Sequence, residues 1–299
     1  MSIIYKYFNW GDEARKILTH QELYFVNADT WKKSGEFDFG FLPLDKSATK
    51  VYMENEILKV HNTDPKFYWR WLNVNLHKYF FEDYKLIKSL STVDKILYED
   101  QLVDKIIAMK LDCMENHPEI YEKEMRKWYF KHTGIFSTST SNNSPQLWAW
   151  KSKLKVPSGS THQSIINYNA ICVGLDLDKV KAILDTVGNY SIAMVKYKEG
   201  RNQIAWVGWG DNFFIQRFNS ITNTLRGDQV KDILQQQEVR ITRFFTDNLS
   251  HRDPARYLQL SKDCISEIII HGKAKQSVKE NVNKYAMAIG CKKLSVFNP

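Results

Sequence analysis

Hydrophobic residues follow two different spacings along the chain, and each spacing predicts a different kind of element. Short runs rich in β-branched and aromatic residues are typical of strands. They predict strands at residues 3–8, 22–27, 135–140, 170–175, 191–197, 203–208, 213–218, 235–242, 267–270 and 294–297. Apolar residues three and four positions apart are typical of helices, and they predict helices at 12–19, 178–187, 228–235 and 273–289. The pattern therefore favours a protein of mixed helix and strand.

One block of the chain has a longer helical pattern than the rest. Between residues 66 and 131, aromatic residues such as Phe67 and Trp71 recur at helical spacing, and we expect three or four helices there. No repeat and no low-complexity linker divides the chain. The simplest architecture is a single α+β domain over residues 1–299, with a helical insertion over about 60–132.

Composition limits the class of protein. The chain has 299 residues, of which 43% are hydrophobic, which is enough for a sizeable core and excludes a disordered or fibrous protein. Its formal net charge of +8 favours nucleic acid or a nucleotide over an acidic partner. No block of five or six like charges occurs, so most of the basic residues are expected on a solvated surface.

The cysteines and the missing motifs narrow the function further. The four cysteines are far apart and have no metal-ligand spacing, so we expect free thiols and no metal site. No apolar signal core or membrane span is visible, which favours a cytoplasmic protein that does not contact membranes. The chain has no GxSxG, HExxH or GxxxxGK[ST] motif, so the common hydrolase, zincin and P-loop mechanisms have no support.

The best candidate for chemistry is the strand predicted at 235–242, with the sequence QQQEVRIT. Alternate side chains of a strand share a face, which places Val239 and Ile241 toward the core. The polar face then carries Gln236, Glu238, Arg240 and Thr242. A carboxylate there could stabilise a developing cation while an amide about 7 Å away orients a nucleophile. The alternative is an ordinary strand with a solvated face.

Three other places offer groups that could hold a substrate. The hydroxyls of the segment 137–139 could bind a substrate or orient a carboxylate, or could be ordinary turn chemistry. Lys6 could contact a pyrophosphate if it faces a cleft, or could be a solvated lysine at a sheet edge. Trp148 and Trp150 would share a face of an extended chain and could wall a flat ligand, or could pack in the core.

Taken in order, these motifs resemble a bacterial and phage family catalogued as a domain of unknown function. The resemblance rests on an aliphatic-Tyr-Lys-Tyr strand at 4–7, a Gly-Ile-x-Ser strand at 134–137 and a Glu-x-Arg strand at 238–240. It covers nearly the whole chain, although each motif is short. The chain departs from the family pattern at 31–38, where the family has Asn-Asp-Pro-Phe, and at Lys151, where it has tyrosine.

The same arrangement is similar to the ADP-ribosyltransferase fold, including the DarT-like enzymes that modify nucleic acid. These transferases carry a basic residue on the first strand, then Ser-Thr-Ser, then a Gln-x-Glu or Glu-x-Glu pair. Lys6, the segment 137–139 and the segment 236–238 occur in this order, although lysine stands where arginine or histidine is typical. The resemblance implies an α+β fold with a split β-sheet core and a large helical insertion, and NAD as the substrate.

The resemblance also implies a role for each site residue. Glu238 would stabilise the oxocarbenium-like ribose left when nicotinamide departs, and Gln236 would orient the acceptor. Lys6 would contact the diphosphate, and Tyr24 or Trp148 would stack on nicotinamide. The implied NAD-binding residues are Lys6, Tyr7, Tyr24, Ser137, Thr138, Ser139 and Trp148.

Three functions remain open at this point. The first is an NAD-dependent ADP-ribosyltransferase, a toxin or phage-defence effector that modifies nucleic acid or protein. An antitoxin or other partner would regulate it. The second is a catalytically inactive module that binds a nucleotide or nucleic acid. The third is a structural protein whose helical insertion docks a partner. The discriminating feature is whether Gln236, Glu238 and the segment 137–139 converge.

Overall fold

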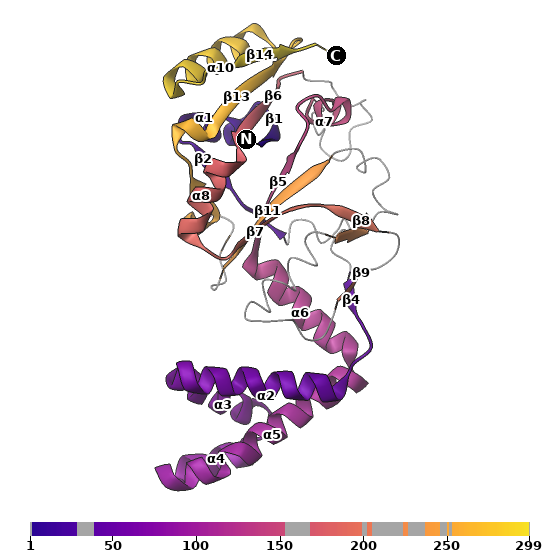
Figure 1. Ribbon diagram of the computed structural model, residues 1–299, viewed down its shortest axis with the longest axis vertical. Coiled ribbons are helices and arrows are strands. Elements are labelled where there is room, and N and C mark those ends of the chain that lie inside the picture. The colour runs from indigo at the N-terminus through magenta and orange to yellow at the C-terminus, as the bar shows by residue number, and fades with distance from the viewer. Residues whose placement is uncertain are drawn as a thin grey trace, which may run out of the picture. The chain divides into compact units, whose positions relative to one another are not determined.

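The computed structural model describes residues 2–28, 39–152, 168–198, 202–204, 224–226, 237–245, 250 and 253–298 (Figure 1). The chain forms two compact units. The first comprises residues 1–39, 128–202 and 214–299, and the second comprises 40–127 and 203–213. The first unit contains an eight-stranded sheet flanked by helices, and the second is mostly helical. The predicted α+β class is therefore confirmed.

The large sheet has the strand order β14-β13-β6-β1-β5-β11-β7, and β3 also pairs with β5. All neighbouring strands are antiparallel except β13 and β14. The bounds are β1 (Ile3–Asn9), β3 (Val26–Asn27), β5 (Thr133–Ser139), β6 (Ala170–Asp176), β7 (Tyr190–Met194), β11 (Glu238–Phe244), β13 (Ile265–His271) and β14 (Leu294–Phe297).

The centre of this sheet is joined by very few backbone pairs. Strands β1 and β5 share a single pair, Tyr5 with Ser139. By contrast, β1 and β6 are paired over seven residues, as are β5 and β11. The sheet therefore has two well-paired halves, β14-β13-β6-β1 and β5-β11-β7 with β3, which meet at one narrow junction. We call this junction the seam.

One face of the sheet is covered by three helices, α1 (Asp12–Thr19), α8 (Leu177–Val187) and α10 (Gln276–Ile289). Each turns an apolar stripe toward the sheet, as their spacing predicts. In α10 the stripe is Val278, Val282, Ala286 and Ile289. Asp176 starts α8 by accepting hydrogen bonds from the backbone N–H groups of residues 178 and 179. We call this side of the sheet the helix face.

The opposite face carries the short helix α7 (Pro145–Lys151). Its Leu147 and Trp148 pack with Tyr7, Cys172 and Ile269 in a second apolar cluster. The extended conformation expected around Trp148 and Trp150 is therefore wrong, because a helix places residues two apart on different faces. The side chain of Trp150 lies outside the described residues.

Three two-stranded ribbons complete the strands. They are β2 (Glu22–Tyr24) with β12 (Tyr257–Gln259), β8 (Lys196–Lys198) with β10 (Thr224–Arg226), and β4 (Phe39–Phe41) with β9 (Asn202–Ile204). Two 3-10 turns, Pro254–Arg256 and Lys262–Cys264, flank β12. The strand predicted at 213–218 and the helix predicted at 228–235 lie outside the described residues.

The helical unit is larger than the sequence pattern indicated. It contains α2 (Lys46–Thr63), α3 (Pro65–Tyr79), α4 (Phe81–Ser89) and α5 (Thr92–Asn116), and α6 (Pro118–His132) leads back to the sheet. The three or four helices expected between residues 66 and 131 are confirmed as the four helices α3 to α6, and one more helix precedes them from Lys46. The extra helix is α2, in which Thr49 alone among the helix's residues is fully buried, so α2 lacks a one-sided apolar stripe. Asp45 marks its start by accepting the N–H of Ala48.

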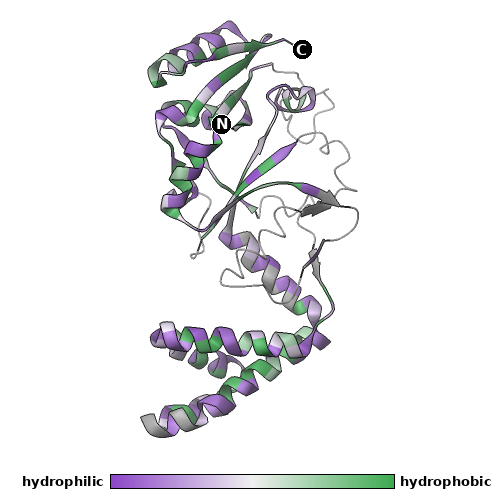
Figure 2. Cartoon of the chain, in the orientation of Figure 1, coloured by the Kyte–Doolittle hydropathy of each residue, from purple (hydrophilic) through white to green (hydrophobic). Residues whose placement is uncertain are grey.

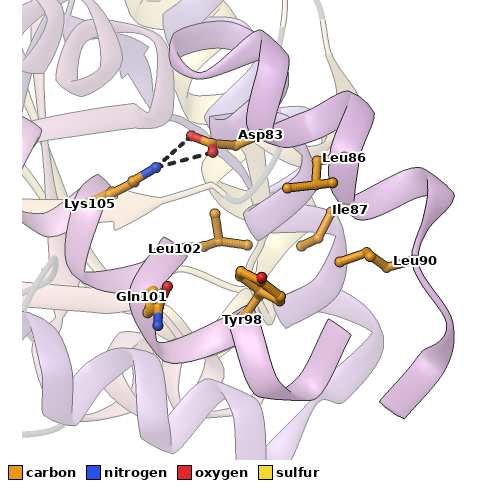
Figure 3. A pocket seen from close by; sticks show the side chains of 8 residues that line it. All are labelled: Asp83, Leu86, Ile87, Leu90, Tyr98, Gln101, Leu102 and Lys105. Carbon is orange, nitrogen blue, oxygen red and sulfur yellow. Dashed lines mark hydrogen bonds and ion pairs between the residues drawn. The ribbon is translucent and has the colours of Figure 1, made fainter. Parts of the chain in front are cut away.

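The core of the helical unit is built from aromatic and aliphatic residues of α3, α4 and α5: Tyr68, Leu72, Leu76, Ile87, Leu102 and Ile106. A hollow of about 70 Å³ lies beside it, between α4 and α5 (Figure 3). Lys105 and Asp83 form an ion pair at its rim, 3.1 Å apart. None of the described helices is long and apolar enough to cross a membrane.

Candidate functional site

Glu238 lies on the same face of the sheet as two of the serines predicted to accompany it. Glu238 is the Cα partner of Ser139, and Arg240 is the Cα partner of Ser137 (β5 and β11 in Figure 1). Directly opposed residues of antiparallel strands point to the same side of the sheet. Segments about 100 residues apart in the chain therefore converge at one place. We call this side the serine face, and α7 packs against another part of it.

Glu238, Arg240 and Thr242, on the polar face of β11, are buried, so the alternative of an ordinary strand with a solvated face does not hold. Glu238 is 8% exposed and Arg240 is 3% exposed. Hydrophilic and hydrophobic residues alternate along the strand (Figure 2), but β11 lies between β5 and β7, and both of its faces are covered. The strand begins at Glu238, three residues later than expected. Gln236 lies outside the described residues, so its role stays a prediction.

Glu238 and Arg240 form a buried ion pair. The Nε of Arg240 donates a hydrogen bond to Oε1 of Glu238 over 2.6 Å. Such a charge-assisted bond fixes the orientation of the carboxylate. Just before the pair, Gln237 has a φ of 45°, in the left-handed region that side-chain-bearing residues seldom adopt. The turn that leads into Glu238 is therefore held in an uncommon backbone conformation.

Lys6 approaches this place from the helix face. Its neighbours Ile4 and Phe8 belong to the core on that face, and its ammonium lies 4.8 Å from the centre of the Phe136 ring. The Nζ donates a hydrogen bond to the backbone oxygen of Ser137, 2.8 Å away. Burial, together with the charge of Lys151, lowers the pKa of Lys6 to about 8. Lys6 therefore bridges the seam, with its amino group bonded to the strand that carries the serines.

The segment 137–139 divides between the two faces. Ser137 and Ser139 lie on the serine face, and Ser139 Oγ accepts the backbone N–H of Ser141. Thr138 points to the helix face, where its hydroxyl donates to the backbone oxygen of Val239 over 2.8 Å. The serines thus accompany Glu238, whereas the threonine ties β5 to β11.

The aromatic candidates have packing partners. Trp148 is 1% exposed, stacks on Phe297 with ring centres 4.7 Å apart, and meets the edge of Tyr7 at 5.2 Å. The hydroxyl of Tyr7 donates to the backbone oxygen of Ser141. Tyr24 lies on the β2 and β12 ribbon, where its ring packs 5.0 Å from that of Tyr257. Neither Tyr24 nor Trp148 is placed beside Glu238 by these contacts.

Two residues that the sequence did not single out extend the site across the sheet. Tyr5 pairs with Ser139 on one side and with Gly174 on the other, and Gly174 pairs with Glu267. Glu267, Gly174, Tyr5, Ser139 and Glu238 therefore form one row on the serine face. The Tyr5 hydroxyl donates to Oε1 of Glu267 over 2.7 Å.

Gly174 makes the contact between Tyr5 and Glu267 possible. A Cβ at this position would lie 2.7 Å from Cγ of Glu267 and 3.1 Å from the Tyr5 ring. A glycine inside a predicted buried strand is a signal for such a close approach. Burial acts to raise the pKa of Glu267, but hydrogen bonds from Lys293 and Tyr5 outweigh it, and the pKa is below its ordinary value.

Two other kinds of site are not found among the described residues. No group of three or more histidine, cysteine, aspartate or glutamate side chains could hold a metal ion there. The hollow of the helical unit in Figure 3 is far below the roughly 300 Å³ of a small-molecule site. The row on the serine face is therefore the best candidate for chemistry in the described part of the chain.

Three comparisons with known proteins found no relative of this chain. No protein-family model, no curated protein and no solved structure matches the chain significantly.

Proposed function

We propose that the chain is an NAD-dependent ADP-ribosyltransferase in which Glu238 is the catalytic carboxylate. One observation carries the proposal: Glu238 is the direct cross-strand partner of Ser139, and Ser137, the partner of Arg240, lies on the same face. Had Glu238 lain on an outer face away from that segment, the enzyme function would have lost its main support. The split at the seam fits the transferase-like core that the motifs imply.

The proposed chemistry needs few groups. The bond between C1′ of the nicotinamide ribose and the ring nitrogen breaks, and nicotinamide leaves with the electron pair. The ribose becomes oxocarbenium-like, and the negative charge of Glu238 stabilises it. A nucleophile of the acceptor then bonds to C1′ and gives up its proton. Gln236 is the proposed residue for orienting that nucleophile.

The neighbours of Glu238 prepare it for this role. Arg240 fixes the carboxylate through its 2.6 Å hydrogen bond. Ser137 and Ser139 supply hydroxyls on the same face, suited to the hydroxyls of the nicotinamide ribose. Lys6 holds the Ser137 carbonyl across the seam and brings positive charge near the site. A direct bond from Lys6 to the diphosphate stays a prediction.

The charge distribution supports a polyanionic acceptor. Residues 40–127, most of the helical unit, contain 14 basic and 15 acidic residues. The rest of the chain, which includes the whole of the large sheet, therefore holds 28 basic and 19 acidic residues, a formal charge of +9. A basic unit attracts nucleic acid by its phosphates. We propose nucleic acid as the acceptor, in a toxin or phage-defence role with an antitoxin or other regulatory partner.

Labelled NAD tests the reaction directly. The protein is incubated with NAD labelled in the adenosine half and with cellular RNA, DNA or protein, beside a Glu238→Gln variant and an exposed-surface control, Glu280→Gln. We expect label in one fraction, a loss of at least about 100-fold in Glu238→Gln and unchanged transfer in Glu280→Gln. Transfer that survives in Glu238→Gln would refute the role of Glu238, and no transfer to any fraction would refute the enzyme.

A second candidate is a catalytically inactive module that binds a nucleotide or nucleic acid. The observation that favours it is the engagement of Glu238 by Arg240, because a carboxylate held in an ion pair can be purely structural. This candidate predicts saturable NAD or RNA binding without release of nicotinamide. Nicotinamide release by the wild type, lost in Glu238→Gln, would exclude it.

A further inference from the structure

Two buried hydroxyls on the serine face have no partner. Among the described residues, the side-chain oxygens of Thr242 and Ser191 are buried and make no hydrogen bond. Thr242 is 0% exposed. The two residues are Cα partners on β11 and β7, so their side chains lie next to one another on the same face.

These hydroxyls continue the line of the catalytic carboxylate. Thr242, Arg240 and Glu238 alternate along β11 and therefore share the serine face. Arg240 is flanked by small side chains, Ala193 on β7 and Ser137 on β5. Ser191, Ala193 and Ser137 are only half-buried, whereas Arg240 is almost fully buried. Within the sheet, the side chain of Arg240 thus lies between the short side chains of its two strand neighbours.

An unpartnered buried hydroxyl is costly. Each one left without a hydrogen bond lowers the stability of the fold, so two adjacent ones call for an explanation. If such a hydroxyl forms a hydrogen bond to a bound ligand, its desolvation cost is removed. The free energy recovered in this way adds to the affinity for the ligand. Two hydroxyl donors beside a guanidinium are the donor set that recognises phosphate oxygens.

We propose that Thr242, Ser191 and Arg240 form a subsite for a diphosphate group. If the proposed function is right, this group is the diphosphate of NAD. Along β11, Arg240 lies two residues (about 7 Å) and Thr242 four residues (about 14 Å) from Glu238. A single ribose separates the reacting carbon of NAD from its diphosphate, so Arg240 marks the end of the subsite next to that ribose. The subsite also supplies the diphosphate contact that the sequence assigned to Lys6, whose amino group is bonded to Ser137.

Inorganic pyrophosphate tests the subsite without relying on the reaction. Its binding is measured by calorimetry for the wild type, Thr242→Val and Ser191→Ala. We expect each variant to bind pyrophosphate and NAD at least 10-fold more weakly than the wild type. Because Val has the shape of Thr and lacks the unpartnered hydroxyl, Thr242→Val should unfold at the same denaturant concentration or a higher one.

Thr138→Val is the matched control. Its hydroxyl lies on the helix face and is bonded to Val239, so its loss should lower stability and leave pyrophosphate binding unchanged. No binding of pyrophosphate by the wild type, or unchanged binding in both Thr242→Val and Ser191→Ala, would overturn the subsite. Pyrophosphate binding that is lost in these variants, in a protein that transfers no label from NAD, would keep the subsite and reject the transferase.

Discussion

Replacing Lys6 by methionine should change how the stability of the fold depends on pH. Methionine keeps the length of the apolar part of the side chain but cannot be protonated, and it loses the hydrogen bond to the Ser137 oxygen. The pKa of Lys6 is lowered to about 8, chiefly by burial, from the ordinary lysine value of 10.5. In the unfolded chain, by contrast, the side chain is solvated. The two states therefore hold this proton over different ranges of pH.

The sign follows from which state keeps the proton. Between pH 8 and 10.5 the unfolded chain binds more protons at this site than the folded protein, so stability rises with pH in that window. With the ordinary and the lowered pKa values, the free energy of unfolding should rise by about 2 kcal/mol between pH 7 and pH 9.5. Because the side chain is only half-buried, we expect about 1–2 kcal/mol. Lys6→Met should lack this gain.

Urea unfolding at pH 7 and pH 9.5 measures the effect. Other groups also titrate in this range, so the quantity of interest is the difference in pH dependence between the wild type and the variant. Lys284→Met, at an exposed position of α10, controls for the loss of one surface lysine. If the wild type and Lys6→Met gained the same stability between the two pH values, the burial of a charged Lys6 at the seam would be refuted.

Two further substitutions test the packing of the serine face, both by urea unfolding. Gly174→Ala should destabilise the fold by about 1–3 kcal/mol, because the new Cβ would press against Glu267 and the Tyr5 ring; unchanged stability would contradict the close approach. Trp148→Ala should cost about 3–5 kcal/mol, because the indole is fully buried between Phe297 and Tyr7. A loss below about 1 kcal/mol would instead fit a tryptophan that is free to stack on a ligand.

The local elements were predictable where one side of an element is apolar. The helix expected at 12–19 and the strand expected at 294–297 have the observed bounds, because their apolar residues recur at a single period. The helix α2 was missed because its apolar residues follow no single stripe. The helical conformation around Trp148 was missed because two aromatic residues two positions apart fit an extended segment equally well.

The candidate site was predictable only in part, because its assembly depends on strand order. Motif order brought Glu238 together with the serines, and they lie on one face, with Ser139 the direct cross-strand partner of Glu238. The sequence could not place Lys6, since either face of β1 was open to it. It also gave no hint that Glu267, 262 residues away, would accept a hydrogen bond from Tyr5. Such contacts are fixed by which strands become neighbours.

The seam has a mechanical consequence for the row that crosses it. Among the described residues, Tyr5 and Ser139 are the only backbone pair across it, and the hydrogen bond from Lys6 to the Ser137 oxygen is a further link. A change in the angle between the two halves would therefore disturb few bonds and would leave the strand pairs within each half intact. Ser139 and Glu238 belong to one half, and Glu267 belongs to the other. Such a rotation would leave the carboxylate and its serine together while moving the far end of the row. A ligand long enough to contact both ends would therefore restrict that angle. The angle between the two halves of the sheet would then differ between the filled and the empty site.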